Sequence, residues 1–257
     1  MKLETCRLEL SDGIAVVALD RPPVNAQNRR LREEVIWLFD SLSEREDVRV
    51  VVLTAVGKVF SAGADIKERV GMAREPGDYI RHNRVTREFF YAVADCAKPV
   101  IAAVNGPALG AGFTLMLSCD IMLCSTDTFV SMPEIDVGLA GGARLLMDHF
   151  GKSWARLLYF TGRKVPAAEL YRLGIVSACV PREQLMDEAM QIAREIAAKS
   201  PLAVRWIKRG FSVVENMPAR DGYRYEQTIT VDLSHTEDAA EAQRAFVEKR
   251  KPQFKGR

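Results

Sequence analysis

The sequence contains few of the residues on which disulfide frameworks, metal sites and histidine catalysis depend. Its 257 residues include five scattered cysteines and three histidines. An odd number of dispersed cysteines argues against a disulfide framework and favours a reducing compartment. No second Cys/His pair accompanies Cys119 and Cys124 at zinc spacing, so we expect buried thiols and no metal site. His82, His149 and His235 match no catalytic motif.

Long apolar runs and an excess of one charge are also absent. No segment approaches the ~18 apolar residues that cross a bilayer, and the first ten residues lack the pattern of a signal peptide. We therefore expect a cytoplasmic protein that does not bind membranes. The net charge is +2, and the basic stretch 249–257 is too short to predict RNA binding, so no nucleic-acid partner is expected.

The hydrophobic pattern predicts an α/β protein. The apolar fraction of 48% and the charged fraction of 27% are ordinary for a globular chain, and the length fits one large domain or a domain with a small appendage. Apolar, β-branched runs predict strands at 14–19, 48–53, 99–104, 121–124 and 129–132. Helical spacing predicts helices at 31–42, 85–97 and 112–119. This alternation indicates crossover units and a largely parallel sheet.

The character of the chain changes after about residue 144, where only helices are predicted. They are expected at 145–150, 153–161, 167–173, 182–199, 201–215 and 238–249. Ser200 followed by Pro201 is typical of a helix start. We therefore expect an α/β core over 1–195 and a C-terminal helical part over 196–257. The charged segment 67–87 is expected to be a mobile surface segment near the ligand.

Two runs of small residues carry most of the functional information. They are 60–68 (FSAGADIKE) and 105–112 (NGPALGAG), and each follows an apolar run and precedes a predicted helix. Small residues let a ligand approach the backbone, and helix N-termini offer unpaired N–H groups. Two such ends aimed at one point would stabilise an oxyanion, which indicates chemistry on a carbonyl such as that of a thioester.

Either run taken alone is also compatible with a tight turn that binds no ligand. A dinucleotide-binding motif is a weaker alternative for the second run, which contains Gly110 and Gly112 after a predicted strand. The third glycine of G-x-G-x-x-G would fall on Leu115, so the pattern fails there.

The two runs, with four further segments in order, resemble the crotonase family, also called the enoyl-CoA hydratase/isomerase family. The further segments are 20–26 (DRPPVNA), 119–121 (CDI), 133–135 (PEI) and 245–254 (AFVEKRKPQF). The resemblance covers nearly the whole chain. It implies a spiral of ββα units with a C-terminal helical part that mediates assembly into a homotrimer or a dimer of trimers. It also implies an acyl-CoA substrate, with no cofactor besides the coenzyme A thioester itself.

The resemblance assigns roles to residues of both runs. It places the two oxyanion N–H donors at Ala62 and Ala111, and alanine can serve at position 111 unless its φ is positive. The backbone around Ala62 and Ala64 would accept the adenine, and we expect Asp65 to support the turn or cap the next helix. The residues expected to bind substrate or coenzyme A are Ala64, Asp65, Ile66, Lys67, Gly110, Gly138 and Lys249.

Glu134 is the candidate acid/base residue. Its apolar neighbours predict partial burial, which raises a carboxyl pKa toward neutrality, and the family carries its proton-exchanging glutamate at this position. Without the resemblance, a surface carboxylate after a proline would be the simpler interpretation. Hydratases of the family have a second glutamate where this chain has Thr114. One carboxylate suits a 1,3-proton shift, which favours an enoyl-CoA isomerase or a one-glutamate hydratase.

Tyr225 provides an alternative function. Residues 221–226 resemble the C-terminal helix of hydroxycinnamoyl-CoA hydratase-lyases, in which a tyrosine at this place binds a phenolic oxygen. An interface or core role is the simpler interpretation of Tyr225. A hydratase-lyase acting on an aryl enoyl-CoA and a non-catalytic acyl-CoA-binding trimer therefore stay open. The acyl group and the direction of reaction are not predicted.

Overall fold

The computed structural model describes all 257 residues and is built around a six-stranded sheet. The strand order is β1 (Cys6–Ser11), β2 (Ile14–Leu19), β3 (Val50–Ala55), β4 (Val100–Val104), β6 (Ile121–Ser125) and β9 (Ala178–Val180). Only β1 and β2 are antiparallel, and every other neighbouring pair is parallel. The prediction of a largely parallel sheet is confirmed. Strand β9, which was not predicted, is only three residues long, too short to stand out as a strand pattern.

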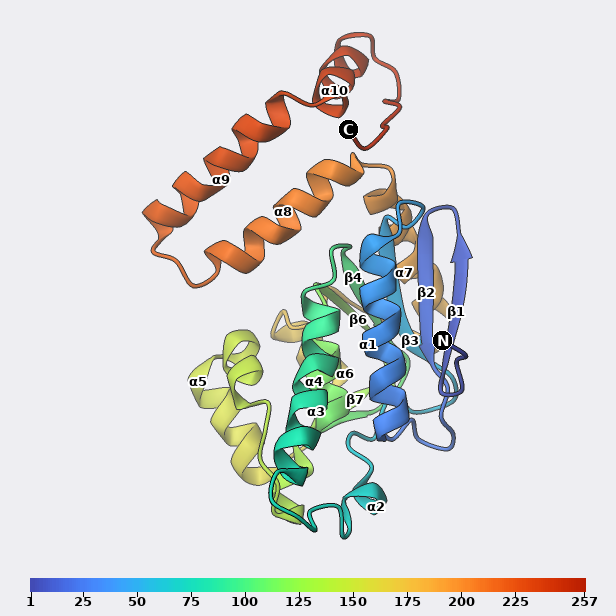
Figure 1. Ribbon diagram of the computed structural model, residues 1–257, viewed down its shortest axis with the longest axis vertical. Helices are drawn as coiled ribbons and strands as arrows, with labels where there is room; N and C mark the ends of the chain where they lie inside the picture. The colour runs from blue at the N-terminus through green and yellow to red at the C-terminus, as the bar shows by residue number, and fades with distance from the viewer.

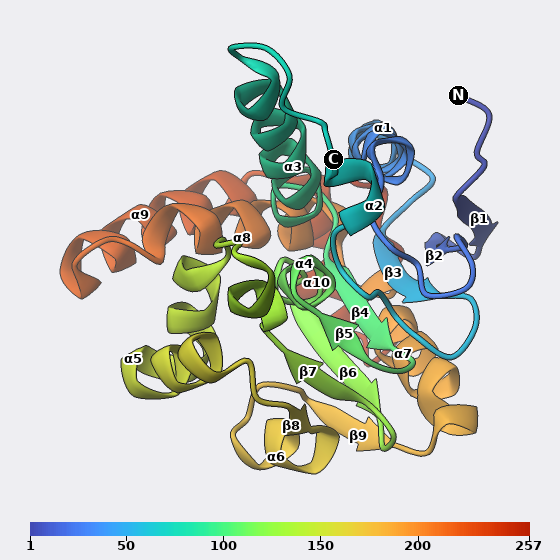
Figure 2. The same cartoon turned by 90° about the horizontal axis from the view of Figure 1, so that it is seen from below.

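A small second sheet lies beside the first (Figure 2). It consists of β5 (Ala108–Leu109), β7 (Phe129–Ser131) and β8 (Val165–Pro166), with β7 in the middle. Strands β5 and β7 are parallel, so the second small-residue run and the segment that leads to Glu134 advance in the same direction. This pairing brings the ends of both segments to one place.

Helices cover both faces of the main sheet, so its central strands are buried on both sides. Helices α1 (Arg29–Glu44) and α3 (Asp78–Ala94) pack against each other on one side (Figures 1 and 2). Helix α7 (Arg182–Ala197) covers the other face, where Leu185 and Ala189 pack with Ile101 and Leu123 of the strands. The sheet is therefore a rigid base for the loops at its edge.

Most helix predictions are confirmed, with two differences. Helix α5 (Ala143–Thr161) is interrupted at Gly151, where φ is 70° and ψ is 168°, so it corresponds to the two helices predicted there. Helix α3 begins at Asp78, which corrects the predicted start at residue 85. The segment 67–87 holds most of α2 (Ile66–Arg69) and the first turns of α3. The Asp78 side chain accepts the N–H groups of Arg74 and Glu75, which defines the helix start despite its charged sequence.

The chain ends in three helices, which we call the C-terminal arm: α8 (Pro201–Val214), α9 (Ala219–Ser234) and α10 (Glu237–Val247). Figure 1 shows the arm standing away from the sheet. Ser200 caps α8 through the Ala203 N–H and Pro201 occupies its first turn, as predicted. Helix α9 covers the segment that only the family resemblance indicated as helical. None of the helices is both long and apolar enough to cross a membrane.

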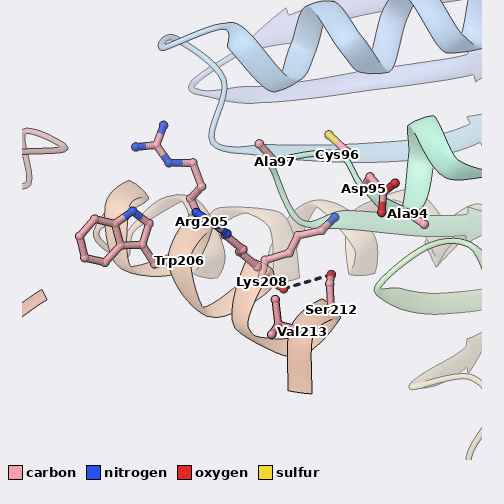
Figure 3. A pocket seen from close by; sticks show the side chains of 10 residues that line it. Ala94, Asp95, Cys96, Ala97, Arg205, Trp206, Lys208, Ser212 and Val213 are labelled. Carbon is pink, nitrogen blue, oxygen red and sulfur yellow. Dashed lines mark hydrogen bonds between the residues drawn. The ribbon is translucent and has the colours of Figure 1, made fainter. Parts of the chain in front are cut away.

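One buried lysine joins the arm to the sheet. Lys208 of α8 donates to the carbonyl oxygen of Lys98 at 2.9 Å and to Asp120 Oδ2 at 2.7 Å. Asp120 also accepts the Val100 N–H, which explains the presence of an aspartate in the motif 119–121. Figure 3 shows Lys208 lining a cavity of about 530 Å³ between α8 and the end of α3. None of the predicted site residues lines this cavity.

Candidate active site

The two small-residue runs lie side by side, in backbone contact. The Leu109 N–H donates to the Ser61 carbonyl oxygen at 2.9 Å, and Ser61 forms a parallel bridge with Ala108. A Cβ atom at Gly63 would lie 2.5 Å from the Leu109 carbonyl oxygen, and one at Gly112 would lie 2.3 Å from that of Ser61. The glycines are therefore required because the two backbones approach too closely for a side chain.

Glu134 is held against the second run. It lies in the 3-10 helix η1 (Pro133–Val137), directly after β7. The Gly110 N–H donates to the Ser131 carbonyl oxygen at 2.9 Å and fixes the end of β7 to the start of α4 (Ala111–Leu117). A Cβ atom at Gly110 would lie 2.2 Å from Glu134 Oε1. The carboxylate thus rests on bare backbone at the N-terminus of α4.

The surroundings of Glu134 raise its pKa above the usual value. Burial is the largest cause, and it outweighs the opposing effects of the Glu134 N–H, the Arg69 charge and the Ala111 N–H. Oε2 of the same carboxylate is buried and has no hydrogen-bond partner. A buried, incompletely satisfied carboxyl with a raised pKa is suited to exchanging protons near neutral pH.

Ala111 is well placed to donate its N–H to an oxyanion. It is the first residue of α4, so its N–H has no acceptor within the helix. Its φ is not positive, which meets the condition set for alanine at this position. The N–H faces the Glu134 carboxylate and lowers the pKa of that group.

The expectation for Ala62 is corrected by the structure. The Ala62 N–H already donates to the Val24 carbonyl oxygen at 2.9 Å. The Ala64 N–H has no hydrogen-bond partner, because the neighbouring groups, the Gly63 carbonyl and the Asp65 N–H, pair with Gln27 and leave Ala64 facing the opposite side. The free donor of the first run is therefore at Ala64, two residues beyond the position that the resemblance suggested.

Thr114 is buried one turn into α4. Its hydroxyl donates to the Gly110 carbonyl oxygen at 3.3 Å, and a Cβ atom at Gly142 would lie 2.8 Å from its Oγ1. Thr114 is thus bonded to Gly110, the residue against which the Glu134 carboxylate lies, but its own side chain carries no charge. Gly138 ends η1 with a φ of 69° and is exposed.

Asp65 has the structural role that was predicted for it. Its side chain caps α2 by accepting the Lys67 N–H at 3.1 Å, and it pairs with Arg21 at 2.8 Å. Ile66 and Lys67 are exposed on the first turn of α2. Their side chains are available to a ligand that approaches the first run from outside.

Tyr225 and Lys249 are not brought to this site within one chain. Tyr225 lies on α9, and Lys249 follows α10, both in the C-terminal arm. Figure 1 shows α10 and α2 at opposite ends of the molecule. If either residue contributes to the site, it must come from another subunit.

Sequence reasoning missed Asn25, and it considered Arg69 only as a cation that could face coenzyme A, not as a neighbour of Glu134. Asn25 has a φ of 50°, and its side-chain amide donates to the carbonyl oxygens of Val56 and Val59, which fixes the loop before the first run. The motif 20–26 contained this residue but gave it no role. Arg69 acts on the Glu134 carboxyl through its charge. No sequence signal distinguished it from neighbouring surface cations.

Comparison with known proteins decides the family. Residues 9–257 match the family described as enoyl-CoA hydratase/isomerase. The chain belongs to this family. An enoyl-CoA hydratase from Bacillus anthracis has the same fold, with a TM-score of 0.93 and 33% identity over 99% of this chain and 100% of that one. The architecture is therefore that of the crotonases.

Two relatives within the family are named for different reactions. The "(7aS)-7a-methyl-1,5-dioxo-2,3,5,6,7,7a-hexahydro-1H-indene-carboxyl-CoA hydrolase" of Rhodococcus jostii (strain RHA1) is 37% identical over 94% of this chain and 93% of its own. Carnitinyl-CoA dehydratase of Citrobacter koseri is 35% identical over 95% of each chain. The protein is an acyl-CoA enzyme of this family, and the reaction must be argued from its own site.

Proposed function

We propose that the protein moves a proton on an enoyl-CoA, with the thioester oxygen held by the N–H groups of Ala64 and Ala111 and with Glu134 as acid and base. The observation that carries this proposal is the position of Glu134, with Oε1 against the Gly110 backbone and a raised pKa. Two N–H donors that bind the developing enolate oxygen lower the activation free energy, by about 3–4 kcal/mol for each donor.

The nature of Thr114 favours isomerisation over hydration. A buried threonine hydroxyl is a poor base at neutral pH and cannot share the activation of water with Glu134. A 1,3-shift needs only one carboxylate. Glu134 would take a proton from C2 of a 3-enoyl-CoA, the electrons would form a dienolate at the thioester, and the same proton would return at C4. Neither water nor a redox partner is consumed.

We also propose how the remaining parts of the chain contribute. Ile66, Lys67, Gly110 and Gly138 would contact the substrate, and Lys249 would reach coenzyme A from a neighbouring subunit. Exposed apolar side chains on the arm support assembly into a homotrimer or a dimer of trimers, namely Ile207, Phe211, Val231, Phe246 and Val247.

The division into a core over 1–195 and a helical part over 196–257 would fall in the last turn of α7. All five cysteines are free thiols, which supports the proposed location in the reducing cytoplasm.

The test follows products of a 3-enoyl-CoA and of the matching trans-2-enoyl-CoA by mass and by chromatography. Isomerisation without a mass change is the expected result, and it should fall about 10²–10⁴-fold in Glu134→Gln. Glu183→Gln, an exposed carboxylate on α7, is the matched control and should keep full activity. Addition of one water to the 2-enoyl substrate would instead establish a one-glutamate hydratase. Full activity in Glu134→Gln would overturn the proposal.

A further inference from the structure

Three buried nitrogen atoms beside the first small-residue run have no hydrogen-bond partner. They are Arg32 Nε on α1, Arg69 Nε on α2 and His82 Nε2 on α3. The Arg32 residue is 1% exposed and His82 is 9% exposed. Buried polar atoms are almost always satisfied in folded proteins, and a charged one without a partner is especially unfavourable. Three of them gathered from three helices indicate a group that binds between them.

A cavity of about 270 Å³ lies at this point. Its lining includes Arg29, Arg32, Glu68, Asp78, Arg81 and His82. The space between α1, α2 and α3 is therefore not filled by side chains, and two of the unpartnered nitrogen-bearing side chains face it. A cavity of this size admits a small polar group.

The carboxylates around the cavity are already engaged. Glu68 accepts the Arg29 N–H at 2.9 and 3.0 Å, and Asp78 pairs with Arg81. Arg29 pairs with Glu33 and Arg81 pairs with Asp78, whereas neither Arg32 nor Arg69 forms an ion pair. The region is thus electrostatically prepared for an anion.

The pKa values in the cluster agree with the presence of these two unpaired guanidinium groups. Burial, followed by the charges of Arg32, Arg69 and Arg29, lowers the pKa of His82 to about 4. Burial and the Arg69 charge lower the pKa of Arg32 to about 10, although Glu68 and Asp65 oppose this shift. Near neutral pH, His82 is therefore a neutral imidazole beside charged guanidinium groups, and an anion would relieve the repulsion among them.

Arg69 connects this cluster to the active site. Its charge lowers the pKa of His82 on one side and that of Glu134 on the other. Its guanidinium lies within reach of the Tyr79 hydroxyl at 3.3 Å, so it is only loosely held within the chain. Helix α2, which carries Arg69, begins at the end of the first small-residue run and lines the cavity through Glu68, so an acyl group that runs along α2 from the first run would approach Arg32 and His82.

We propose that Arg32, Arg69 and His82 bind a carboxylate at the far end of the acyl group, so that the preferred substrates are ω-carboxyl acyl-CoA thioesters. A guanidinium offers paired N–H donors in a plane that matches a carboxylate, and His82 adds a further donor. This inference rests on the proposed function, since it requires that an acyl-CoA binds with its thioester at Glu134. The rival source of an anion is a phosphate of coenzyme A itself, and the experiment separates the two.

The experiment measures binding by calorimetry with saturated thioesters, which cannot react. Glutaryl-, adipyl- and suberyl-CoA are each compared with the monocarboxylic acyl-CoA of the same carbon number. Several chain lengths are compared because only an acyl group of matching length would place its terminal carboxylate at Arg32, Arg69 and His82. We expect at least one dicarboxylic thioester to bind about tenfold or more tighter than its monocarboxylic partner. In Arg32→Met that preference should disappear while the monocarboxylic thioester binds as before.

Two controls keep the result interpretable. Arg87→Met removes an exposed arginine of α3 that pairs only with Glu88 and should preserve the preference. The His82 ring resonances, followed by NMR against pH, should titrate at higher pH when the preferred thioester is bound, since an anion favours the imidazolium. A purely structural role for Arg32 would not produce this ligand-dependent shift.

The outcomes are distinct. Equal binding of both thioesters at every length, or a preference that survives in Arg32→Met, would overturn the carboxylate site. An equal loss of affinity for both members of a pair in Arg32→Met would assign the anion to coenzyme A and also overturn it. Failure of every thioester to bind the wild-type protein would instead refute the proposed function on which the site depends.

Discussion

Glu34 and Glu134 are both withdrawn from solvent, yet their carboxylates have opposite surroundings. Glu34, on α1, is fully buried and accepts the Glu4 N–H, the Thr5 N–H and hydroxyl, and Arg30 Nε, at 2.7–2.9 Å. Burial alone would raise the pKa of Glu34. The hydrogen bonds together lower it by a larger amount, so the net pKa lies below its usual value. Glu134 keeps a buried oxygen without a partner, and its pKa is raised.

The difference shows how one chain uses buried charge for two purposes. The Glu34 carboxylate fastens the N-terminal segment to α1, because four donors compensate its burial. The Glu134 carboxylate lacks such compensation and remains available for a proton. Arg32, only two residues before Glu34 on the same helix, resembles Glu134 in being buried without a partner at Nε. At Glu134 and Arg32, the missing hydrogen bond is one of the observations from which a ligand is inferred.

The largest expected effect comes from disturbing the backbone on which Glu134 rests. Gly110→Ala would place a Cβ atom 2.2 Å from Glu134 Oε1, at a residue whose φ is 52°. We expect the kcat/KM of isomerisation to fall by about a hundredfold or more, because small displacements of a catalytic group carry such costs. The measurement is a steady-state assay on folded variant protein.

Gly141→Ala is the matched control for this substitution. A Cβ atom at Gly141 meets nothing within 4 Å, and its φ lies outside the left-handed region. The activity of this variant should match that of the wild type. If Gly110→Ala also retained full activity, the carboxylate would not need the position described for it, and its contrast with Glu34 would lose its functional meaning.

The second effect is a loss of stability at Glu34, whose buried charge is compensated by hydrogen bonds. Glu34→Gln removes the negative charge and replaces one of the two acceptor oxygens by an NH2 group, which then faces buried donors such as those of Thr5 and Arg30. This change should lower the free energy of unfolding by about 3 kcal/mol. Glu33→Gln is the control, since its side chain is 40% exposed and pairs only with Arg29. That change should stay within about 0.5 kcal/mol. Urea denaturation measures both, and similar losses in the two variants would remove the distinction drawn for Glu34.

A smaller effect of opposite sign is expected at Glu134. Glu134→Gln replaces an incompletely satisfied carboxylate by a neutral amide of similar shape. The free energy of unfolding at pH 7 should rise by about 1 kcal/mol, while activity is lost. Urea denaturation at pH 7 provides the measurement. A loss of stability would mean that the Glu134 carboxylate is compensated after all.

The sequence predicted the architecture because the elements that compose it are periodic and apolar. Strands such as 48–53 and the two halves of α5 needed only local patterning to be recognised. Helix α3 was placed seven residues late, since its start depends on contacts of one side chain, Asp78, with backbone groups upstream. Boundaries of this kind are set by capping rather than by periodicity.

The site was predicted in part, and its limits have a physical cause. Family resemblance indicated both runs and Glu134, which the structure brings together. The choice between Ala62 and Ala64 depended on which N–H is already bonded, and that is decided by pairing with the distant segment 24–27. Arg32 could not be recognised at all, because an arginine among core positions of α1 resembles a surface cation until α2 and α3 are in place.

The smallest effect, and the sharpest contrast, is the pH dependence of the two glutamates. The Glu34 pKa is lowered on folding, so its contribution to stability is present above the usual carboxyl pKa of about 4.5 and is lost as the pH falls below it. The Glu134 pKa is raised, so its contribution is present below about 4.5 and is lost as the pH rises through the folded-state value.

The measurement is the difference in unfolding free energy between the wild type and each Gln variant from pH 3 to 7. In this difference the contributions of all other carboxylates cancel. The advantage of wild type over Glu34→Gln should therefore grow with increasing pH, whereas its deficit relative to Glu134→Gln should appear only above about pH 4.5. Two difference curves of the same sign would show that the two carboxylates do not differ in the way their contacts indicate.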